Sequence, residues 1–274
     1  MSHSVESMLK KEPKHTLRNV LIISLLVFLS VWSFSAIEFQ GINQAGVQVV
    51  RNIAGYFVWP DRNPDNPVLA KYLFSFETFA VPYLMLETVM IAFLGTFFGA
   101  IISIPFAFLS SKNIVGEKKS LIGATVITMI RTVPIFIWGI IFIRIQGGAM
   151  AGVLAIAISS IGMISKLYIE VIEDIDKGIL EALDSTGATA LQKIRYGIFP
   201  QLTANFLSVA IYRFEINVRN ATILGLVGAG GIGFTIIDAL GSFNFGIVAV
   251  ALWGIIPVVL IIEYFSTKLR AKLT

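Results

Sequence analysis

The chain has 274 residues, of which 56% are hydrophobic and 14% are charged, with a net charge of +4 and a mean hydropathy of +0.82. A soluble domain usually carries about 25% charged residues, so too few remain here to cover a water-facing surface. The apolar residues stand in blocks of about 20, the length that a helix needs to cross a bilayer. Because these blocks do not alternate with period two, we predict an all-α, polytopic membrane bundle rather than a β-barrel.

Two residue types that often carry out chemistry are either absent from the sequence or confined to its N-terminal tail, which limits the reactions that the chain could catalyse. There is no cysteine, which excludes disulfides, thiolate metal sites and a cysteine nucleophile. His3 and His15 both lie in the polar N-terminal tail, so no histidine is available within the membrane. We therefore expect no catalytic residue, no metal site and no cofactor held by this chain. The positive charge follows membrane topology, so we expect no nucleic-acid partner.

The first part of the chain is predicted to form an anchor helix followed by an external loop. Residues 1–19 form a basic tail and the first apolar block runs over 20–37. A signal peptide has this pattern, but the block is long for one, which favours an uncleaved anchor helix. The stretch 41–59 alternates polar and apolar residues, as an interfacial segment does, and three prolines then interrupt any helix over 59–67. The anchor and external loop together occupy 20–77.

Five further apolar blocks bring the predicted number of spans to six. They lie at about 80–109, 121–145, 149–168, 200–224 and 245–266. Fourteen Lys and Arg residues fall on one side of this arrangement and four on the other, which marks the first side as cytoplasmic. Both termini are then cytoplasmic. Residues 78–270 form the main transmembrane domain, and its longest cytoplasmic loop spans about 165–199.

This long loop carries a recognisable pattern. Residues 181–194 favour helix, Gly187 interrupts them, and Pro200 stands where a new helix can begin without an N–H group. The segment resembles the EAA loop of permease subunits in ATP-binding-cassette (ABC) importers. The matching residues are Glu181, Ala182, Gly187 and Pro200, whereas Leu183, Gly197 and Phe199 depart from the family pattern. The resemblance implies that the loop docks on a separate ATPase subunit; the alternative is an amphipathic helix on the membrane surface.

Charged residues also fall inside the predicted spans. A charge at the bilayer centre costs about 2.5–3.5 kcal/mol on insertion scales, so each should face a cavity, a partner or a substrate. Glu215 and Arg219 are four residues apart with the acid first, which predicts that they pair. Glu87 lies in the second span without a local partner. We regard these three residues as candidates for a structural or gating role.

Two intramembrane arginines are left without a local acid. Arg213 shares a helix face with Asn217 and Asn220, and Arg131 has no acid within a helical turn. A guanidinium offers a planar fork of donors that suits phosphate-like oxygens. We therefore predict that these four residues line the path of an oxyanion. The alternative is that either arginine forms an interhelical salt bridge, to Glu87 or to another protomer.

A glycine-rich segment follows the fifth span. It matches G-x-G-x-x-G, but a dinucleotide site needs a preceding strand, and a membrane span precedes this one. We interpret it as a flexible or re-entrant turn that lines a cavity and lets helices approach closely. Its candidate structural or gating residues are Gly228, Gly230, Gly231 and Gly233.

The arrangement as a whole resembles one transporter family. The run Arg213-x-Glu215-x-Asn217-x-Arg219 before the glycines, and Arg131-x-x-Pro134, are similar to segments of phosphonate importer permeases with the MetI-like fold. The resemblance covers about 80–270. It implies a bacterial cell membrane protein that works with a second copy of itself, two ATPase subunits holding ATP and Mg, and an external substrate-binding protein. The substrates it implies are phosphonates or phosphite, hypophosphite or phosphate.

Other functions remain open from the sequence. One alternative function is that of an ABC importer permease for methionine or an osmolyte, although arginines without local acids argue against a neutral or cationic substrate. An ion-driven secondary transporter is another, and it would use intramembrane acids such as Glu87. A membrane-embedded enzyme is the third alternative, but the spans offer few residues that could catalyse a reaction. The chain has no G-x-x-x-x-G-K-[ST] phosphate loop, so any ATP must bind another polypeptide.

Overall fold

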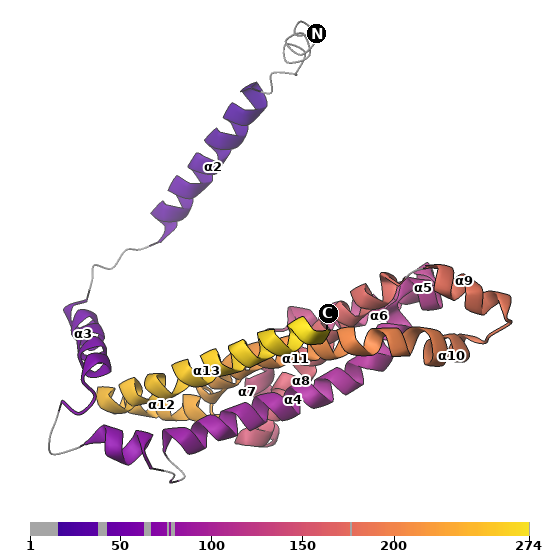
Figure 1. Cartoon of the computed structure of the whole chain (residues 1–274). Helices are drawn as coiled ribbons and strands as arrows, with labels where there is room; N and C mark the ends of the chain where they lie inside the picture. The colour runs from indigo at the N-terminus through magenta and orange to yellow at the C-terminus, as the bar shows by residue number, and fades with distance from the viewer. Residues whose placement is uncertain are drawn as a thin grey trace, which may run out of the picture. The chain divides into compact units, whose positions relative to one another are not determined.

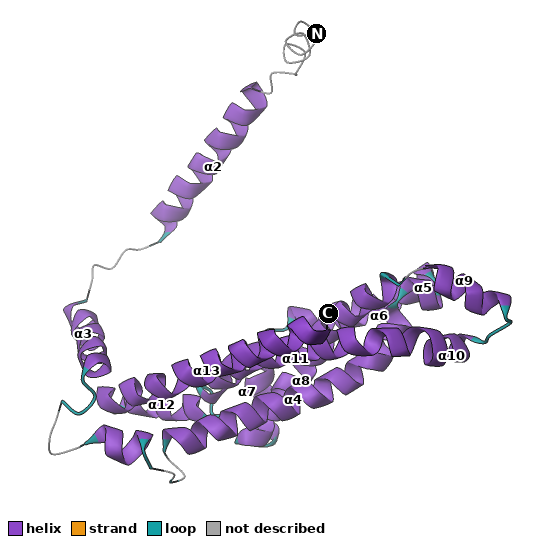
Figure 2. Ribbon diagram, viewed as in Figure 1, coloured by secondary structure: helices purple, strands orange, loops and turns teal. Residues whose placement is uncertain are grey.

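The computed structural model describes residues 16–37, 43–62, 67–75, 77, 80–175 and 177–273. Every regular element within these ranges is helical, as predicted (Figure 2). The chain divides into two units, Met1–Val50 and Arg51–Thr274, which are described separately.

The first unit is dominated by a single apolar helix. Helix α2 (Thr16–Ala36) has 21 residues, or about 31 Å at 1.5 Å per residue, which is enough to cross the hydrocarbon core. Its apolar side chains are exposed all round, as expected for a helix surrounded by lipid. A helix is thus present at the predicted first span, and its role as an uncleaved anchor stays a prediction. Most of the basic tail predicted at 1–19, and residues 63–66 of the proline-rich loop, lie outside the described residues.

The second unit is a bundle built around four long helices. They are α4 (Val81–Ser110), α8 (Ala149–Glu173), α11 (Phe199–Gly225) and α13 (Phe245–Leu273) (Figure 1). Helices α4 and α8 pack closely along much of their length. Glycines of α4 make this possible: a Cβ on Gly95 would lie 2.6 Å from Ile156, and one on Gly99 would lie 2.6 Å from Ser160. Small residues at membrane helix contacts allow this backbone approach.

The predicted span over 121–145 is broken in the structure. Helix α6 (Glu117–Thr132) and helix α7 (Ile135–Ile145) meet at an 80° bend. Pro134 explains the break, because it lacks an N–H donor and disfavours helical geometry at the residue before it. Val133 is accordingly extended, with φ −84° and ψ 117°. The predicted span is therefore a bent pair of helices, and Pro134 was the sequence signal for the bend.

The number of apolar spans is also lower than the six predicted. Among the described residues, four helices are long and apolar enough to cross a membrane, or five if α6 and α7 count as one broken span. Helix α11 is long enough, with 27 residues, but it is not one of them. It carries two arginines, a glutamate and several amide side chains, which lower its hydropathy. The predicted fifth span is therefore a helix, but a polar one packed against its neighbours.

Short elements cap the two ends of this bundle. At one end lie α5 (Lys112–Val115), α9 (Lys177–Ser185), α10 (Ala190–Gln192) and the π-helical turn η2 (Lys193–Ile198). Away from that end lies α12 (Ile232–Gly241), and η1 (Leu69–Leu73) packs against the start of α4 and against α13 (Figure 1). The basic loops around 112–119 and 177–195, which topology assigned to one side of the membrane, thus share one end of the bundle.

Candidate functional site

Arg213 of α11 is a buried arginine with few partners. Its side chain is 6% exposed. Its Nη2 donates to the Ser159 hydroxyl of α8 at 3.4 Å, a long hydrogen bond. Its Nε is fully buried and has no hydrogen-bond partner among the described residues. A guanidinium removed from water in this way has unused donor capacity.

Arg131 of α6 contacts the same helix, α8. It lies in the last turn of α6, just before the bend, and its Nε approaches the Met163 sulfur at 3.3 Å. Its aliphatic stem passes over Gly162, where an added Cβ would lie 2.8 Å from the Arg131 Cγ. Gly162 is therefore required for this approach.

The two arginines meet one face of α8. Ser159, Gly162 and Met163 are spaced i, i+3 and i+4, so they lie on one side of that helix. The contacts with Arg213 and Arg131 are thus about 6 Å apart along the α8 axis. In the described part of the chain neither arginine forms an ion pair, and Glu87 pairs with neither. The sequence placed both arginines in the membrane, but only the fold brings them to a common surface.

Asn217 has a clear structural role in this region. It is fully buried, and its Nδ2 donates to the hydroxyls of Thr96 and Ser160, each at 2.8 Å. Asn220 donates in turn to the Asn217 Oδ1 at 3.3 Å. This network joins α4, α8 and α11 directly beside Arg213. A role for the two asparagines in an anion path stays a prediction.

The predicted Glu215–Arg219 pair is present and extends to a second helix. Arg219 Nη2 lies 2.7 Å from Glu215 Oε1. The second carboxylate oxygen accepts from Ser266 at 3.1 Å and from Arg270 at 3.4 Å, both on α13. Glu215 is 7% exposed, so this carboxylate ties α11 to α13 within the bundle.

The glycine-rich segment forms the tight turn that was predicted after α11. Gly228, Gly230 and Gly231 have φ values of 89°, 82° and 73°, a region that favours glycine. The N–H of Ile232 donates to the Thr88 hydroxyl of α4 at 2.9 Å, which fixes the start of α12. The turn borders a cavity of about 530 Å³, which is also lined by Glu87 and other residues of α4 and α12.

Glu181 and Ala182 lie exposed on α9. Gly187 then turns the chain with φ 74°, so the predicted helix–turn–helix is present. The apolar side chain of Leu191, on the second helix, is 79% exposed. The loop therefore offers a mixed polar and apolar surface for another protein to contact.

The end of this loop agrees with the prediction for Pro200, which lies in the first turn of α11. What was not predicted is that α10, η2 and α11 follow one another without a gap from 190 to 225. The wider π-turn accommodates the proline. The N–H of Phe199 donates to the carbonyl of Ile194, and Pro200, which has no N–H, leaves no backbone donor without a partner. The exposed loop is thus joined rigidly to the helix that carries Arg213.

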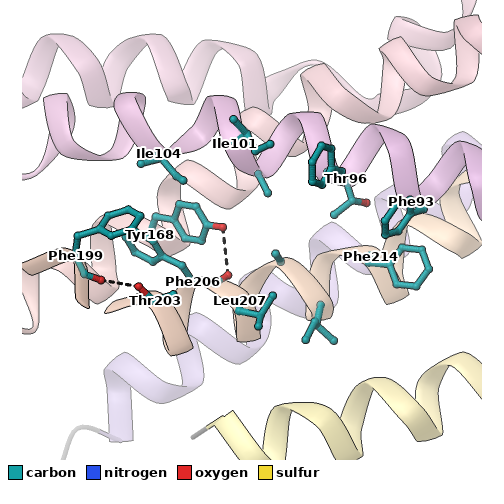
Figure 3. Close-up of a pocket in the computed structure, with 14 residues that line it drawn as sticks. Phe93, Thr96, Ile101, Ile104, Tyr168, Phe199, Thr203, Phe206, Leu207 and Phe214 are labelled. Atoms are coloured by element: carbon teal, nitrogen blue, oxygen red, sulfur yellow. Dashed lines mark hydrogen bonds between the residues drawn. The ribbon is translucent and has the colours of Figure 1, made fainter. Parts of the chain in front are cut away.

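An apolar cavity between α4, α8 and α11 was not predicted. It measures about 400 Å³ and is lined largely by aromatic and aliphatic side chains, with Thr96 at one edge (Figure 3). The Tyr168 hydroxyl donates to the Phe206 carbonyl at 3.2 Å, and the two rings stack at 4.1 Å. The repeat of Phe93 and Phe97 on one face of α4 was the available signal. This lining offers no charge to an anion.

Comparisons with known proteins agree with this architecture. A family described as binding-protein-dependent transport system inner membrane component matches residues 103–274. A phosphite transport system permease of Stutzerimonas stutzeri is 37% identical over 193 residues, covering 68% of each chain. A putative phosphite transport system permease of the same organism is 30% identical over 272 residues, covering 98% of this chain and 91% of that one.

A solved structure supports the fold independently. The inward-facing structure of a methionine ABC transporter superposes with a TM-score of 0.60 at 21% identity, covering 69% of this chain and 94% of that one. The all-helical bundle with several apolar helices agrees with this fold. The chain belongs to the family of binding-protein-dependent transport system inner membrane components.

Proposed function

We propose that this chain is the permease subunit of an ATP-driven importer for phosphonate or a related phosphorus oxyanion such as phosphite, hypophosphite or phosphate. The observation that carries the choice of cargo is the buried Arg213, whose Nε has no partner in the described part of the chain. Within a bilayer such a charge is costly unless something compensates for it. A passing oxyanion would supply that compensation during transport.

Arg131 and Arg213 fit this role together. Their α8 contacts are about one helical turn apart, and neither forms an ion pair with a described acid. Two guanidinium groups converging on one surface repel each other, and a divalent or monovalent oxyanion between them would remove that repulsion. The forked donors of arginine also match the oxygens of a phosphorus acid better than a lysine would.

The loop from 165 to 199 would couple this path to ATP hydrolysis. In this proposal Glu181, Ala182 and Gly187 belong to the surface that docks on an ATPase subunit, and Pro200 to the joint beyond it. A movement of the docked loop would pass directly into α11, because the helical path from 190 to 225 is unbroken. The bundle could then open alternately to the two sides of the membrane.

The remaining parts of the machine would lie on other chains. The proposal assigns ATP and Mg to two ATPase subunits, and delivery of the substrate to an external binding protein. A second copy of the chain would complete the pathway, in a bacterial cell membrane with both termini cytoplasmic. The chain itself would perform no chemistry on its cargo. Residues 20–77 would serve as anchor and external loop, and 78–270 as the transport domain.

Methionine is the nearest competing cargo, since the fold is shared with a methionine transporter. That likeness, at 21% identity, shows the fold alone. A zwitterionic amino acid has no need of two arginines without acid partners, which favours the oxyanion. An ion-driven transporter is the other competitor, and it would need no ATPase.

Co-purification tests the proposal at its coupling step. The complex is extracted from native membranes in mild detergent and its subunits are identified by mass spectrometry, for the wild type and for Glu181→Lys. We expect an ATPase with a phosphate loop to accompany the wild type and to be lost from Glu181→Lys. Glu117→Lys makes the same charge change at an exposed position outside the loop and should keep the ATPase. A wild type that purifies without any ATPase would favour the ion-driven transporter.

A further inference from the structure

Helix α3 (Gln44–Val58) separates its residues sharply into two faces. At 100° per residue one side is apolar and the other polar. The apolar face consists of Val47, Val49, Val50, Ile53, Ala54 and Phe57. The polar face consists of Gln44, Gln48, Arg51 and Asn52. None of its residues is buried, and Val50 is 67% exposed. Within the described part of the chain most of the apolar face is therefore exposed, and Val49 and Ile53 are half-buried.

The length of α3 decides how it can meet a membrane. Its 15 residues extend about 22 Å, which is too short for the roughly 30 Å hydrocarbon core. Its polar face would also be stranded among acyl chains if the helix stood upright. A short helix with these two faces is suited to lying in the plane of the interface, with its apolar side about 5–10 Å deep.

The C-terminal end of α3 is fixed beside a membrane-spanning helix. The Phe57 carbonyl accepts a hydrogen bond from the indole N–H of Trp253 at 3.0 Å, and the two rings meet edge to face at 6.2 Å. Trp253 lies eight residues into α13, about 12 Å from its start. Tryptophan favours this boundary depth because its ring is apolar and its N–H needs a partner.

The surface of α13 below this contact faces outward. Ile256, Leu260 and Tyr264 follow Trp253 at helical spacing and are 46%, 59% and 62% exposed. This stripe is the apolar surface that a spanning helix presents to lipid. Phe57, the last residue of the apolar face of α3, contacts Trp253 at the start of this stripe, so within the second unit the two exposed surfaces meet. That continuity identifies the occupant as the bilayer.

We infer that α3 is an interfacial helix that rests on the leaflet opposite the α9–α10 end of the bundle. Its apolar face lies among the upper acyl chains. Arg51, on the polar face, lies at the level of the lipid phosphates, which suit a guanidinium. The helix would hold the external end of α13 at a fixed depth. This inference is independent of which solute the protein carries.

The absence of cysteine makes the inference directly measurable. Single-cysteine variants of the full chain are spin-labelled in nanodiscs of phosphatidylcholine and phosphatidylglycerol. Val50→Cys and Ala54→Cys report the apolar face, and Gln44→Cys and Arg51→Cys the polar face. Collision rates are measured with oxygen, which concentrates in lipid, and with a water-soluble nickel chelate. We expect the oxygen-to-nickel ratio to be several-fold higher for both apolar-face labels than for both polar-face labels.

Two results would overturn the inference. Equal nickel access on both faces would place the helix in water. Apolar-face labels shielded from both reagents would mean that protein covers them, either a second copy or an external partner. Variants are used only if they elute as a single species, and the two positions on each face make the outcome independent of any one substitution.

Discussion

At the scale of single residues, the charged and amide side chains of α11 serve different purposes although they stand within eight positions. Glu215 is satisfied by three donors, and Asn217 by two hydroxyls. Arg213, which precedes both residues, has one long hydrogen bond and a buried Nε without a partner in the described chain. Among the described residues, Arg213 thus differs from Glu215 and Asn217 in keeping a buried donor that is not used.

Helical spacing alone predicts part of this pattern. It identifies the Glu215–Arg219 pair and the common face of Arg213, Asn217 and Asn220. Helical spacing cannot predict the contacts of Glu215 with Ser266 and Arg270, because these residues follow about 50 positions later and reach Glu215 only through the fold. Such long-range partners depend on which helices pack together, and a single sequence does not specify that.

Replacing Asn217 tests its structural role. Asn217→Ala removes two interhelical hydrogen bonds, so we expect a loss of about 1–2 kcal/mol in stability. The measurement is thermal unfolding of the detergent-solubilised protein. Asn220→Ala, which loses one bond of 3.3 Å, should cost less than half as much. Equal losses for the two variants would contradict the importance of the Asn217 network.

At the scale of helices, α11 and α13 are joined by the carboxylate of Glu215. Glu215→Ala removes the acceptor shared by Arg219, Ser266 and Arg270. We expect destabilisation of about 1–3 kcal/mol, less than for a fully buried pair because Arg219 is partly exposed. Chemical denaturation in mixed micelles would measure it.

Glu263→Ala is the matched control for this link. Its carboxylate is 53% exposed and lies 3.5 Å from Arg219. An exposed ion pair contributes about 0–1 kcal/mol, so this variant should stay close to the wild type. If Glu263→Ala destabilised the protein as much as Glu215→Ala, the link between α11 and α13 would not depend on burial of the carboxylate.

The turn between α11 and α12 offers a second test at this scale. A Cβ at Gly233 would collide with the carbonyl oxygen of Thr222, which is a backbone atom and cannot easily move. We expect Gly233→Ala to lower the yield of folded protein sharply, as judged by size-exclusion chromatography. Gly241→Ala, in the same helix but with open space around its Cβ position, should be tolerated. Normal yield of Gly233→Ala would show that the turn is not closely packed.

Helix existence was largely predictable, and helix continuity was not. Long apolar runs and Lys/Arg asymmetry identify the spans because the bilayer imposes a minimum length and charge rule. The bend at Val133–Pro134 and the unbroken path through Pro200 depend on how two prolines are accommodated. One lies at an extended residue and breaks the helix; the other follows a π-turn and does not.

At the scale of the whole molecule, the bundle carries a candidate functional segment at each end and two arginines between them. The exposed loop containing Glu181 lies at one end, and the glycine turn lies away from it. Between them, Arg131 of α6 and Arg213 of α11 contact α8. One helical path runs from Ala190 to Gly225 and carries Arg213, so in the proposed function a movement of the loop would be passed to this arginine. This connection underlies the proposed coupling of ATP hydrolysis to oxyanion transport.

The most direct test is uptake of labelled phosphite, phosphate and methylphosphonate into proteoliposomes containing the assembled transporter, its binding protein and ATP. We predict ATP-dependent uptake of at least one of these oxyanions by the wild type. Loss of a charged donor costs about 1.5–3 kcal/mol, so Arg213→Leu and Arg131→Leu should each reduce uptake by about 10- to 100-fold while the complex stays assembled. Arg144→Leu, at an exposed arginine of α7, should transport normally. Normal uptake by both Arg213→Leu and Arg131→Leu, or a wild type that carries D-methionine and none of the oxyanions, would contradict the account.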